Sequence, residues 1–230
     1  MAKREAAGIH NVSHERRARE KEALRQSILR AAGEVFLERG YDGLSMRQVA
    51  ERIGYTATTI YLYFKNKDDL LFALLNEGYA ELGQRLAASA AEERDPLQRL
   101  AAIGRAYVAF GLERSLLYQV MFMRRADFLA ARFNESRDDA DTVHHINPFH
   151  VLAQAVTGAL EAGALKPGDV MTYAMSFWSV VHGLVSLALI APNAEAGLIE
   201  RMTQLTLSAT LSGLQAATDA TARKQPRRGG

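Results

Sequence analysis

Apolar residues recur at helical spacing along nearly the whole chain, and no stretch alternates as a β-strand would. Glycine, proline and capping residues divide this pattern into separate segments. A less regular region, 113–133, and a polar loop follow the fifth segment. We expect helices at Glu15–Glu38, Met46–Ile53, Ala57–Tyr63, Asp68–Ala90, Pro96–Gly111, Pro148–Glu161, Asp169–Ile190 and Ala194–Ala217. The chain is therefore predicted to be all-α, with about nine or ten helices in total when the less regular region is counted with these eight.

Met46–Lys65 describes two short helices joined by a tight turn. Ser45 and Thr56 offer capping side chains immediately before each helix. Gly54 stands where the turn needs a positive φ, and Ala50 is small where two crossing helices must approach. These features together predict a helix-turn-helix.

The aromatic run that follows has two kinds of position. Ile60 and Phe64 are four residues apart and share a helical face, so we expect them to pack in the core. Tyr61 and Tyr63 lie on other faces, where a phenol can reach a phosphate. Lys67 adds a cation near a helix start, and exposed N–H groups there also attract phosphate.

Composition narrows the class of protein. The chain has 230 residues, is 48% hydrophobic and contains no cysteine, which excludes disulfides and thiolate zinc sites. The net charge of +2 does not identify a nucleic-acid binder, but basic residues crowd both ends as solvated tails or phosphate-attracting arms. The start has no secretory h-region, and the apolar stretch Phe177–Pro192 is shorter than the roughly 20 residues of a membrane span. We expect a cytoplasmic protein.

Three stretches, ILRAAGEVFLERGYDG, LSMRQVAERIG and GYTATTIYLYFKNKDDLLFALL, together resemble the DNA-binding domain of TetR family transcription regulators over about Glu22–Leu75. More weakly, FWSVVHGLVSLAL is similar to a Trp-…-His-Gly pattern in one branch of that family's regulatory domains. The resemblance implies a flexible basic arm at 1–21 and a helix-turn-helix DNA-binding domain at 22–67. It also implies a helical ligand-binding and dimerisation domain at 68–217 and a flexible basic tail at 218–230.

The resemblance also implies roles for individual residues. Arg47 would reach a guanine edge, Ala57 and Thr58 would face bases, and Tyr63 stands where the family usually has histidine. The third helix departs from the usual pattern, because it has no Arg, Asn or Gln between Thr56 and Phe64 to read bases in a bidentate manner. The expected DNA-binding residues are Ser45, Arg47, Gln48, Thr56, Ala57, Thr58, Thr59, Tyr61, Tyr63 and Lys67.

Wide, adaptable side chains between Ile103 and Phe149 suit an apolar pocket and an ordinary core equally well. The resemblance favours an effector cavity, lined by Tyr107, Phe110, Tyr118, Met121, Phe122, Phe128, Phe149, Trp178 and His182. His182 is either a satisfied buried histidine or a polar anchor for ligand. The last two helices would form a dimer interface through Val181, Val185, Leu189, Leu198, Met202, Leu205 and Ala209.

The acidic and histidine-rich loop Asp138–His150 matches no metal-site spacing, so a solvated loop is the preferred interpretation, and we expect no metal and no cofactor. An enzyme or a carboxylate-bridged metal bundle would need inward Glu-x-x-His pairs, and the sequence has none. We expect a homodimeric regulator, more a repressor than an activator, that binds a palindromic operator in double-stranded DNA and is released by a small, largely apolar effector. A helical adaptor or ligand-binding bundle without sequence-specific DNA binding stays open as the alternative.

Overall fold

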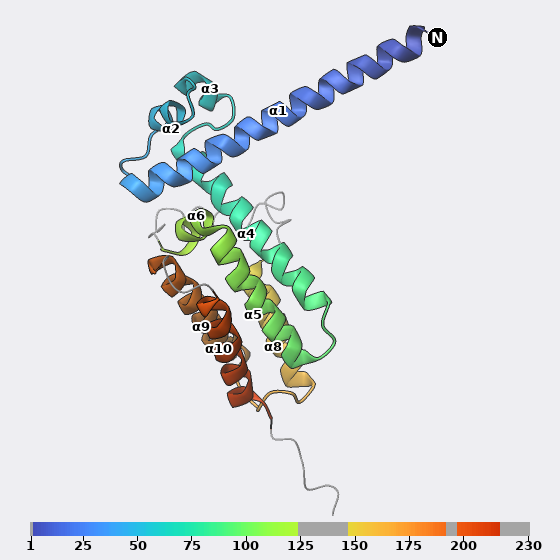
Figure 1. The fold of residues 1–230 in the computed structure, drawn as a ribbon, viewed down its shortest axis with the longest axis vertical. Coiled ribbons are helices and arrows are strands. Elements are labelled where there is room, and N and C mark those ends of the chain that lie inside the picture. The colour runs from blue at the N-terminus through green and yellow to red at the C-terminus, as the bar shows by residue number, and fades with distance from the viewer. Residues whose placement is uncertain (1, 124–146, 192–196, 217–230) are drawn as a thin grey trace, which may run out of the picture. The chain divides into compact units, whose positions relative to one another are not determined.

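The computed structural model describes residues 2–123, 147–191 and 197–216, with side chains described from residue 15 onward. These residues form helices joined by short turns, with one isolated bridge between Leu165 and Gln215 (Figure 1). The predicted all-α class is confirmed. The helices are α1 (Ala2–Arg39), α2 (Met46–Arg52), α3 (Ala57–Tyr61), α4 (Lys67–Ala91), α5 (Pro96–Glu113), α6 (Ser115–Tyr118), the π-helix η1 (Gln119–Met123), α8 (Pro148–Glu161), α9 (Val170–Ile190) and α10 (Leu198–Leu214).

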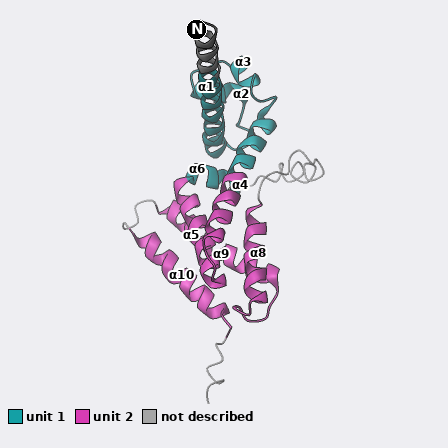
Figure 2. Ribbon diagram, turned by 90° about the vertical axis from the view of Figure 1, so that its right-hand side faces the viewer, with its two compact units in different colours: residues 1–79, 114–145 teal, residues 80–113, 146–230 magenta. Residues whose placement is uncertain are grey.

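The chain divides into two compact units (Figure 2). Unit 1 comprises residues 1–79 and 114–145, and unit 2 comprises residues 80–113 and 146–230. The long helix α4 contributes to both, because the division falls between Tyr79 and Ala80.

In unit 1, α1 packs against α2, α6 and η1. Ile28, Ala32 and Val49 are almost completely buried at the centre of this core. Gly33 of α1 permits a close approach, since a Cβ there would lie 3.1 Å from Leu116 Cδ2. Short side chains and glycine at such crossings let helices pack closely.

The helix α1 starts much earlier than the sequence pattern indicated. We expected a flexible arm over residues 1–21 and a helix from Glu15, whereas the helix begins at Ala2. The segment lacks proline and is rich in alanine, glutamate, lysine and arginine, which favour helix even without an apolar face. The periodicity of apolar residues does not indicate such a helix, because that periodicity arises only where one face of a helix is buried.

Unit 2 is a bundle of α5, α8, α9 and α10, and α5 contacts the other three. Phe110, Ala159 and Val185 lie fully inside it. Gly104 of α5 brings the chain so close to α10 that an added Cβ would lie 2.6 Å from Leu207 Cδ2. Side chains cap two of these helix starts, where Asn147 accepts from the Phe149 amide and Asp169 from the Thr172 amide.

The region expected to be less regular contains short helical segments, and the last helix starts later than expected. The irregular region after α5 contains the short helix α6 and the π-helix η1, and residues 124–133 of that region lie outside the described residues. The last helix runs from Leu198, after Gly197 with a φ of 81°, rather than from Ala194. Length and composition alone would let α9 cross a membrane, but core helices pass the same test.

Candidate nucleic-acid interface

Local sequence builds the pair of short helices α2 and α3. The Ser45 hydroxyl accepts from the Gln48 amide at 3.3 Å, and the Thr56 hydroxyl accepts from the Thr59 amide at 3.4 Å. Gly54 adopts a φ of 73°, which allows the Tyr55 amide to donate back to the Ala50 carbonyl at 2.9 Å. The turn between the helices is therefore fixed by its own backbone.

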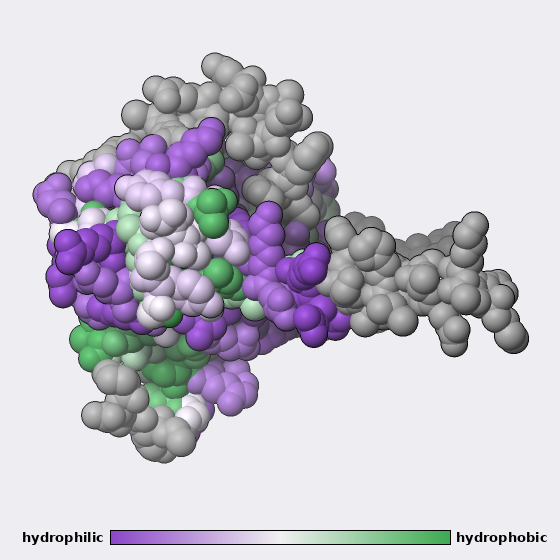
Figure 3. All heavy atoms as spheres, turned by 90° about the horizontal axis from the view of Figure 1, so that it is seen from above, coloured by the Kyte–Doolittle hydropathy of each residue, from purple (hydrophilic) through white to green (hydrophobic). Residues whose placement is uncertain are grey.

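The inner and outer sides of α3 differ sharply. Ile60 is completely buried and Phe64 is 4% exposed, so this side is anchored in unit 1. On the outer side Tyr61 is 56% exposed and Leu62 is 77% exposed, with Thr58 exposed beside them. Figure 3 shows this end of the unit as a pale, weakly polar patch with scattered green, bordered by strongly polar side chains. Such a surface suits contact with thymine methyl groups and sugars.

Two exposed residues of this surface are absent from the predicted set. Tyr55 is 49% exposed in the turn before α3, and Leu62 ends the helix. Leu62 lies four residues after Thr58, so helical spacing alone would have placed it on the same face. Leu62 was assigned no role in the sequence analysis.

Arg47 and Gln48, two predicted DNA-binding residues of α2, have different surroundings. Arg47 is highly exposed, and its Nε donates to Glu51 Oε1 at 2.8 Å, which raises the pKa of the guanidinium. The buried amide oxygen of Gln48 has no hydrogen-bond partner among the residues that the structure describes. Buried polar atoms without a hydrogen-bond partner are rare in folded proteins. A rotamer of Gln48 that brings this oxygen to a polar partner would therefore be favoured.

The threonines of α3 partly satisfy each other. The Thr56 and Thr59 hydroxyl oxygens lie 3.1 Å apart, so one donates to the other. Thr59 and Ala57 are half-buried, while Thr58 is exposed. Thr58, the threonine that was predicted to face bases, therefore has an accessible side chain. Tyr63 is half-buried near the end of the same segment.

Lys67 lies at the start of α4 and contacts Tyr41 in the turn between α1 and α2. Its ammonium donates to the Tyr41 carbonyl at 3.0 Å and lies 3.9 Å from the centroid of the Tyr41 ring. The Tyr41 hydroxyl donates to Asp68, which raises the tyrosine pKa to about 12. These contacts hold the start of α4 against the turn and leave further ammonium donors for a phosphate.

A second ion cluster joins α2 to α1. Arg52 donates to both carboxylate oxygens of Glu38, at 2.8 and 2.6 Å, and to Glu34 at 3.3 Å. The hydrogen bond from Arg52 lowers the pKa of Glu38 below its usual value. Because this fork is bidentate, it restrains orientation as well as distance between the two helices.

Three of the predicted ligand residues meet inside unit 2. The Trp178 indole N–H donates to the Tyr107 hydroxyl oxygen at 3.2 Å, and that oxygen lies 3.2 Å from His182 Nδ1. The Trp178 and His182 rings stack with centroids 4.8 Å apart. Burial lowers the pKa of His182 below its usual value, which favours the neutral imidazole.

The remaining predicted ligand residues are distributed over both units. Phe110 and Phe149 belong to unit 2, where Phe110 is completely buried. In unit 1 the rings of Tyr118 and Phe122 lie 5.0 Å apart, and Met121 is 6% exposed. Phe128 and the loop residues Asp138–His145 lie outside the described residues.

The predicted dimer surface needs a correction. Val181 and Val185 are 2% and 0% exposed within the subunit's own core, so they have no surface to offer a partner. Leu205 and Ala209 are exposed, and Leu189, Leu198 and Met202 are half-buried. Exposed apolar residues that were not predicted accompany them on α9, namely Met171, Met175, Leu187 and Ile190.

Two family descriptions match successive parts of the chain. Residues 28–74 match the family described as bacterial regulatory proteins, tetR family, and residues 100–220 match the tetracyclin repressor-like C-terminal domain. The probable HTH-type transcriptional regulator ArpR of Pseudomonas putida is 29% identical over 191 residues, 76% of this chain and 84% of ArpR.

Two further relatives cover different shares of the chain. The fatty acid metabolism regulator protein of Bacillus subtilis is 36% identical over 76 residues, which is 33% of this chain and 39% of that protein. The solved SmeT–triclosan complex superposes with a TM-score of 0.64 at 22% identity, and the match covers 89% of this chain and 98% of SmeT. At that identity the superposition shows the shared fold alone.

Proposed function

Because the chain belongs to the TetR family of helix-turn-helix transcription regulators, which are DNA-binding proteins and not enzymes, we propose that it is a homodimeric, effector-released repressor. Two subunits would place two copies of α3 on the half-sites of a palindromic operator. Helix-turn-helix dimers use half-sites about 34–36 Å apart or a multiple of that distance. The protein would act in the cytoplasm, where its DNA lies.

The observation that carries this proposal is the two-sided environment of α3. Its inner side is held by Ile60 and Phe64, while Thr58, Tyr61 and Leu62 stay exposed. A soluble domain usually buries such apolar side chains unless another molecule covers them. A duplex groove provides methyl groups, sugars and phosphates at one surface, which matches this mixture of methyl, ring and hydroxyl groups.

Dimer formation is supported by the outer faces of α9 and α10. The whole of α9 contains no aspartate, glutamate, lysine or arginine. Its exposed positions include Leu187 at 55% and Ile190 at 72%, and Leu205 of α10 is also 72% exposed. Serine, alanine and glycine between them allow close approach of a second subunit. Uncharged, apolar surface of this kind is typical of permanent homodimer interfaces.

An effector would bind in unit 2 near the Tyr107–Trp178–His182 cluster. Aromatic rings offer apolar contact there, and the hydroxyl and imidazole offer a few orienting hydrogen bonds, as binding sites usually do. The related protein SmeT has been solved in complex with triclosan, which is a small and largely apolar molecule. The continuous helix α4 belongs to both units and would carry the response. For the effector to release the protein from DNA, the free energy that couples effector binding to DNA binding must be about 1–3 kcal/mol or more.

A gel-shift assay with the full-length protein and the DNA upstream of its own gene tests the proposal. We expect one retarded species that persists in excess non-specific competitor, with a protected region showing two-fold symmetry. If any competitor DNA removes the retarded band equally well, or if binding depends on the salt concentration but not on the DNA sequence, the result would support the adaptor or ligand-binding alternative instead. Addition of small apolar compounds would then identify an effector by loss of the shifted band.

A further inference from the structure

The described side chains nearest the N-terminus of α1 are exposed on every side. Residues 15–23 are all exposed, whereas Ile28, Leu29 and Ala32 further along the helix are buried. This segment therefore receives no stabilisation from packing. An isolated helix of such length is marginal in water, so contacts with another molecule would stabilise it.

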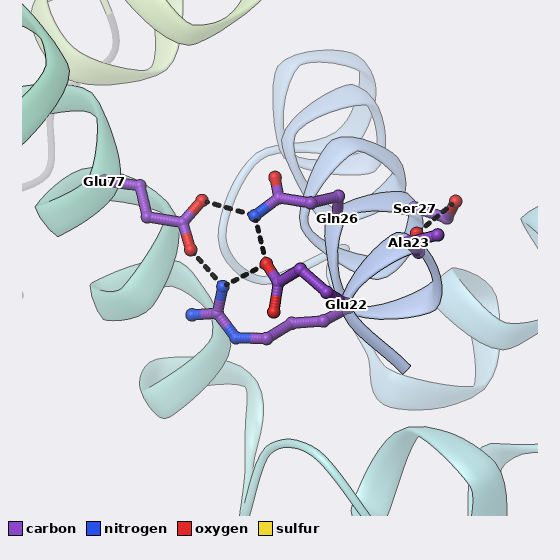
Figure 4. A network of polar contacts seen from close by, with 6 residues as sticks. Glu22, Ala23, Gln26, Ser27 and Glu77 are labelled. Atoms are coloured by element: carbon purple, nitrogen blue, oxygen red, sulfur yellow. Dashed lines mark hydrogen bonds and ion pairs between the residues drawn. The ribbon is translucent and has the colours of Figure 1, made fainter. Parts of the chain in front are cut away.

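A polar network marks the point where α1 joins the body of unit 1. Arg25 donates to Glu77 of α4, and Gln26 donates to Glu77 at 3.2 Å and to Glu22 at 2.9 Å (Figure 4). The Arg25 guanidinium carbon also lies 5.7 Å from the centroid of the Phe64 ring. Phe64 lies three residues after the last residue of α3, so this network lies beside the end of the candidate DNA-reading helix.

The acidic residues of the exposed segment are largely occupied. Glu20 pairs with Arg16 at 3.4 Å, and Glu22 lies 3.6 Å from Arg25. Arg17 and Lys21 form no ion pair within the described ranges of the chain, and both are exposed. They are four residues apart and thus neighbours on one helical face, where like charges are unfavourable unless an anion lies between them.

The same face continues into Arg25, four residues further on. Each step of four residues advances about 6 Å along a helix. Lys21 and Arg17 therefore lie roughly 6 and 12 Å beyond the point at which Arg25 meets Phe64, and close to the same side of α1. A row of cations that begins beside the end of α3 and extends past it matches the phosphate backbone of a duplex running beyond the bases that α3 would read.

We infer that Arg17 and Lys21 bind phosphates of double-stranded DNA outside the half-site, which makes the exposed part of α1 a second DNA-contacting element. The inference rests on the proposed function. The contacts carry no sequence information, because phosphate is the same at every base pair. They lengthen the DNA segment that the protein needs for full affinity, and they increase the dependence of binding on salt.

The test compares Arg17→Gln/Lys21→Gln with the wild type on two duplexes. Both duplexes contain the same site, selected from a random-sequence library with the full-length protein. One ends at the edges of the site, and the other carries ten additional base pairs on each side. A control, Arg94→Gln/Arg105→Gln, removes two exposed cations of unit 2 and so causes an equal change of net charge.

On the long duplex the Arg17/Lys21 variant should bind about tenfold or more weakly at low salt. The salt slope, which is the steepness with which the logarithm of the binding constant falls with the logarithm of the salt concentration, should decrease by about 1.8 for each subunit. On the short duplex it should match the wild type, and its order of preference among sequences should stay the same. An equal loss on both duplexes, or a loss no larger than that of the control, overturns the inference. If the wild type selects no sequence at all, the proposed function itself fails, and this inference falls with it. Circular dichroism of each variant shows whether the helix persists.

Discussion

The Lys67 ammonium nitrogen lies 3.9 Å from the centroid of the Tyr41 ring and 3.0 Å from the Tyr41 carbonyl oxygen. This pair joins the start of α4 to the turn between α1 and α2. Lys67 was predicted as a phosphate contact, and the structure adds a role within the protein. An ammonium has three N–H donors, so the contact with Tyr41 and a contact with DNA are compatible.

Lys67→Ala should weaken binding to all DNA sequences alike and reduce the salt slope by about one unit for each subunit. Binding isotherms at several salt concentrations measure this. Tyr41→Phe is the matched control, because it removes the hydrogen bond to Asp68 and keeps the ring and carbonyl that Lys67 contacts. An unchanged slope for Lys67→Ala would mean that the lysine serves only the contact with Tyr41.

Arg47→Ala should weaken binding roughly 5- to 150-fold and relax the choice of base at one position of each half-site. Selection of bound sequences before and after the change measures both effects. The neighbouring change Glu51→Gln removes the carboxylate to which Arg47 donates at 2.8 Å, so it should keep or raise affinity. A uniform loss over all sequences would instead assign Arg47 to a phosphate.

Leu205→Glu should weaken the dimer at least about tenfold, because it would place an unpaired charge in an apolar interface. Sedimentation or light scattering over a range of protein concentrations gives the dissociation constant. The control is Gln204→Glu, the adjacent exposed residue, which carries the same charge on another part of the helix. A dimer unaffected by Leu205→Glu would place the interface away from this face of α10.

Gly104→Val should lower the free energy of unfolding by about 1–3 kcal/mol, as overpacked cores do. A Cβ at this position would already lie 2.6 Å from Leu207 Cδ2 and 3.1 Å from Phe177 Cζ, and both neighbours are buried. The same change at Gly158, where an added Cβ meets nothing within 4 Å, should leave stability nearly unchanged. Denaturant melts of the two variants compare the positions directly.

His182 should make the fold less stable as the pH falls below its ordinary pKa. Burial lowers the folded-state pKa, so the unfolded chain binds the proton more readily. Above the unfolded-state pKa of about 6.5 both states are neutral and the residue adds no pH dependence, whereas stability declines from there through the folded-state pKa. The melting temperature of His182→Gln should fall less steeply than that of the wild type between these limits. If the melting temperatures of the variant and the wild type change with pH in parallel, a group other than His182 causes the pH dependence.

The fold class and several helix starts followed from local chemistry that the sequence states directly. The caps expected at Ser45 and Thr56 are both present, because each acts within a few residues of itself. Positions that depend on distant packing were harder to place. Val181 lies on a good apolar stripe, but only the three-dimensional arrangement shows that its own subunit already covers it.

The candidate site shows the same limit. The inward Ile60 and Phe64 were predicted from their spacing, and both are buried. Leu62 is among the most exposed apolar residues described, and its spacing of four residues from Thr58 indicates the side on which it lies but not how far it is exposed. The meeting of Tyr107 with Trp178 and His182 joins residues of α5 and α9, and helical spacing within one element cannot predict a contact between two.

The outer side of α3 bears a leucine, tyrosines and a threonine, and no amide or guanidinium between Thr56 and Phe64. In the proposed complex with DNA, a surface of this composition would distinguish thymine from cytosine by the methyl group on carbon 5. 5-Methylcytosine carries that same methyl group, so enzymatic methylation of a cytosine would make it resemble thymine at this surface. The operator's affinity would thereby respond to the epigenetic state of the chromosome as well as to its base sequence.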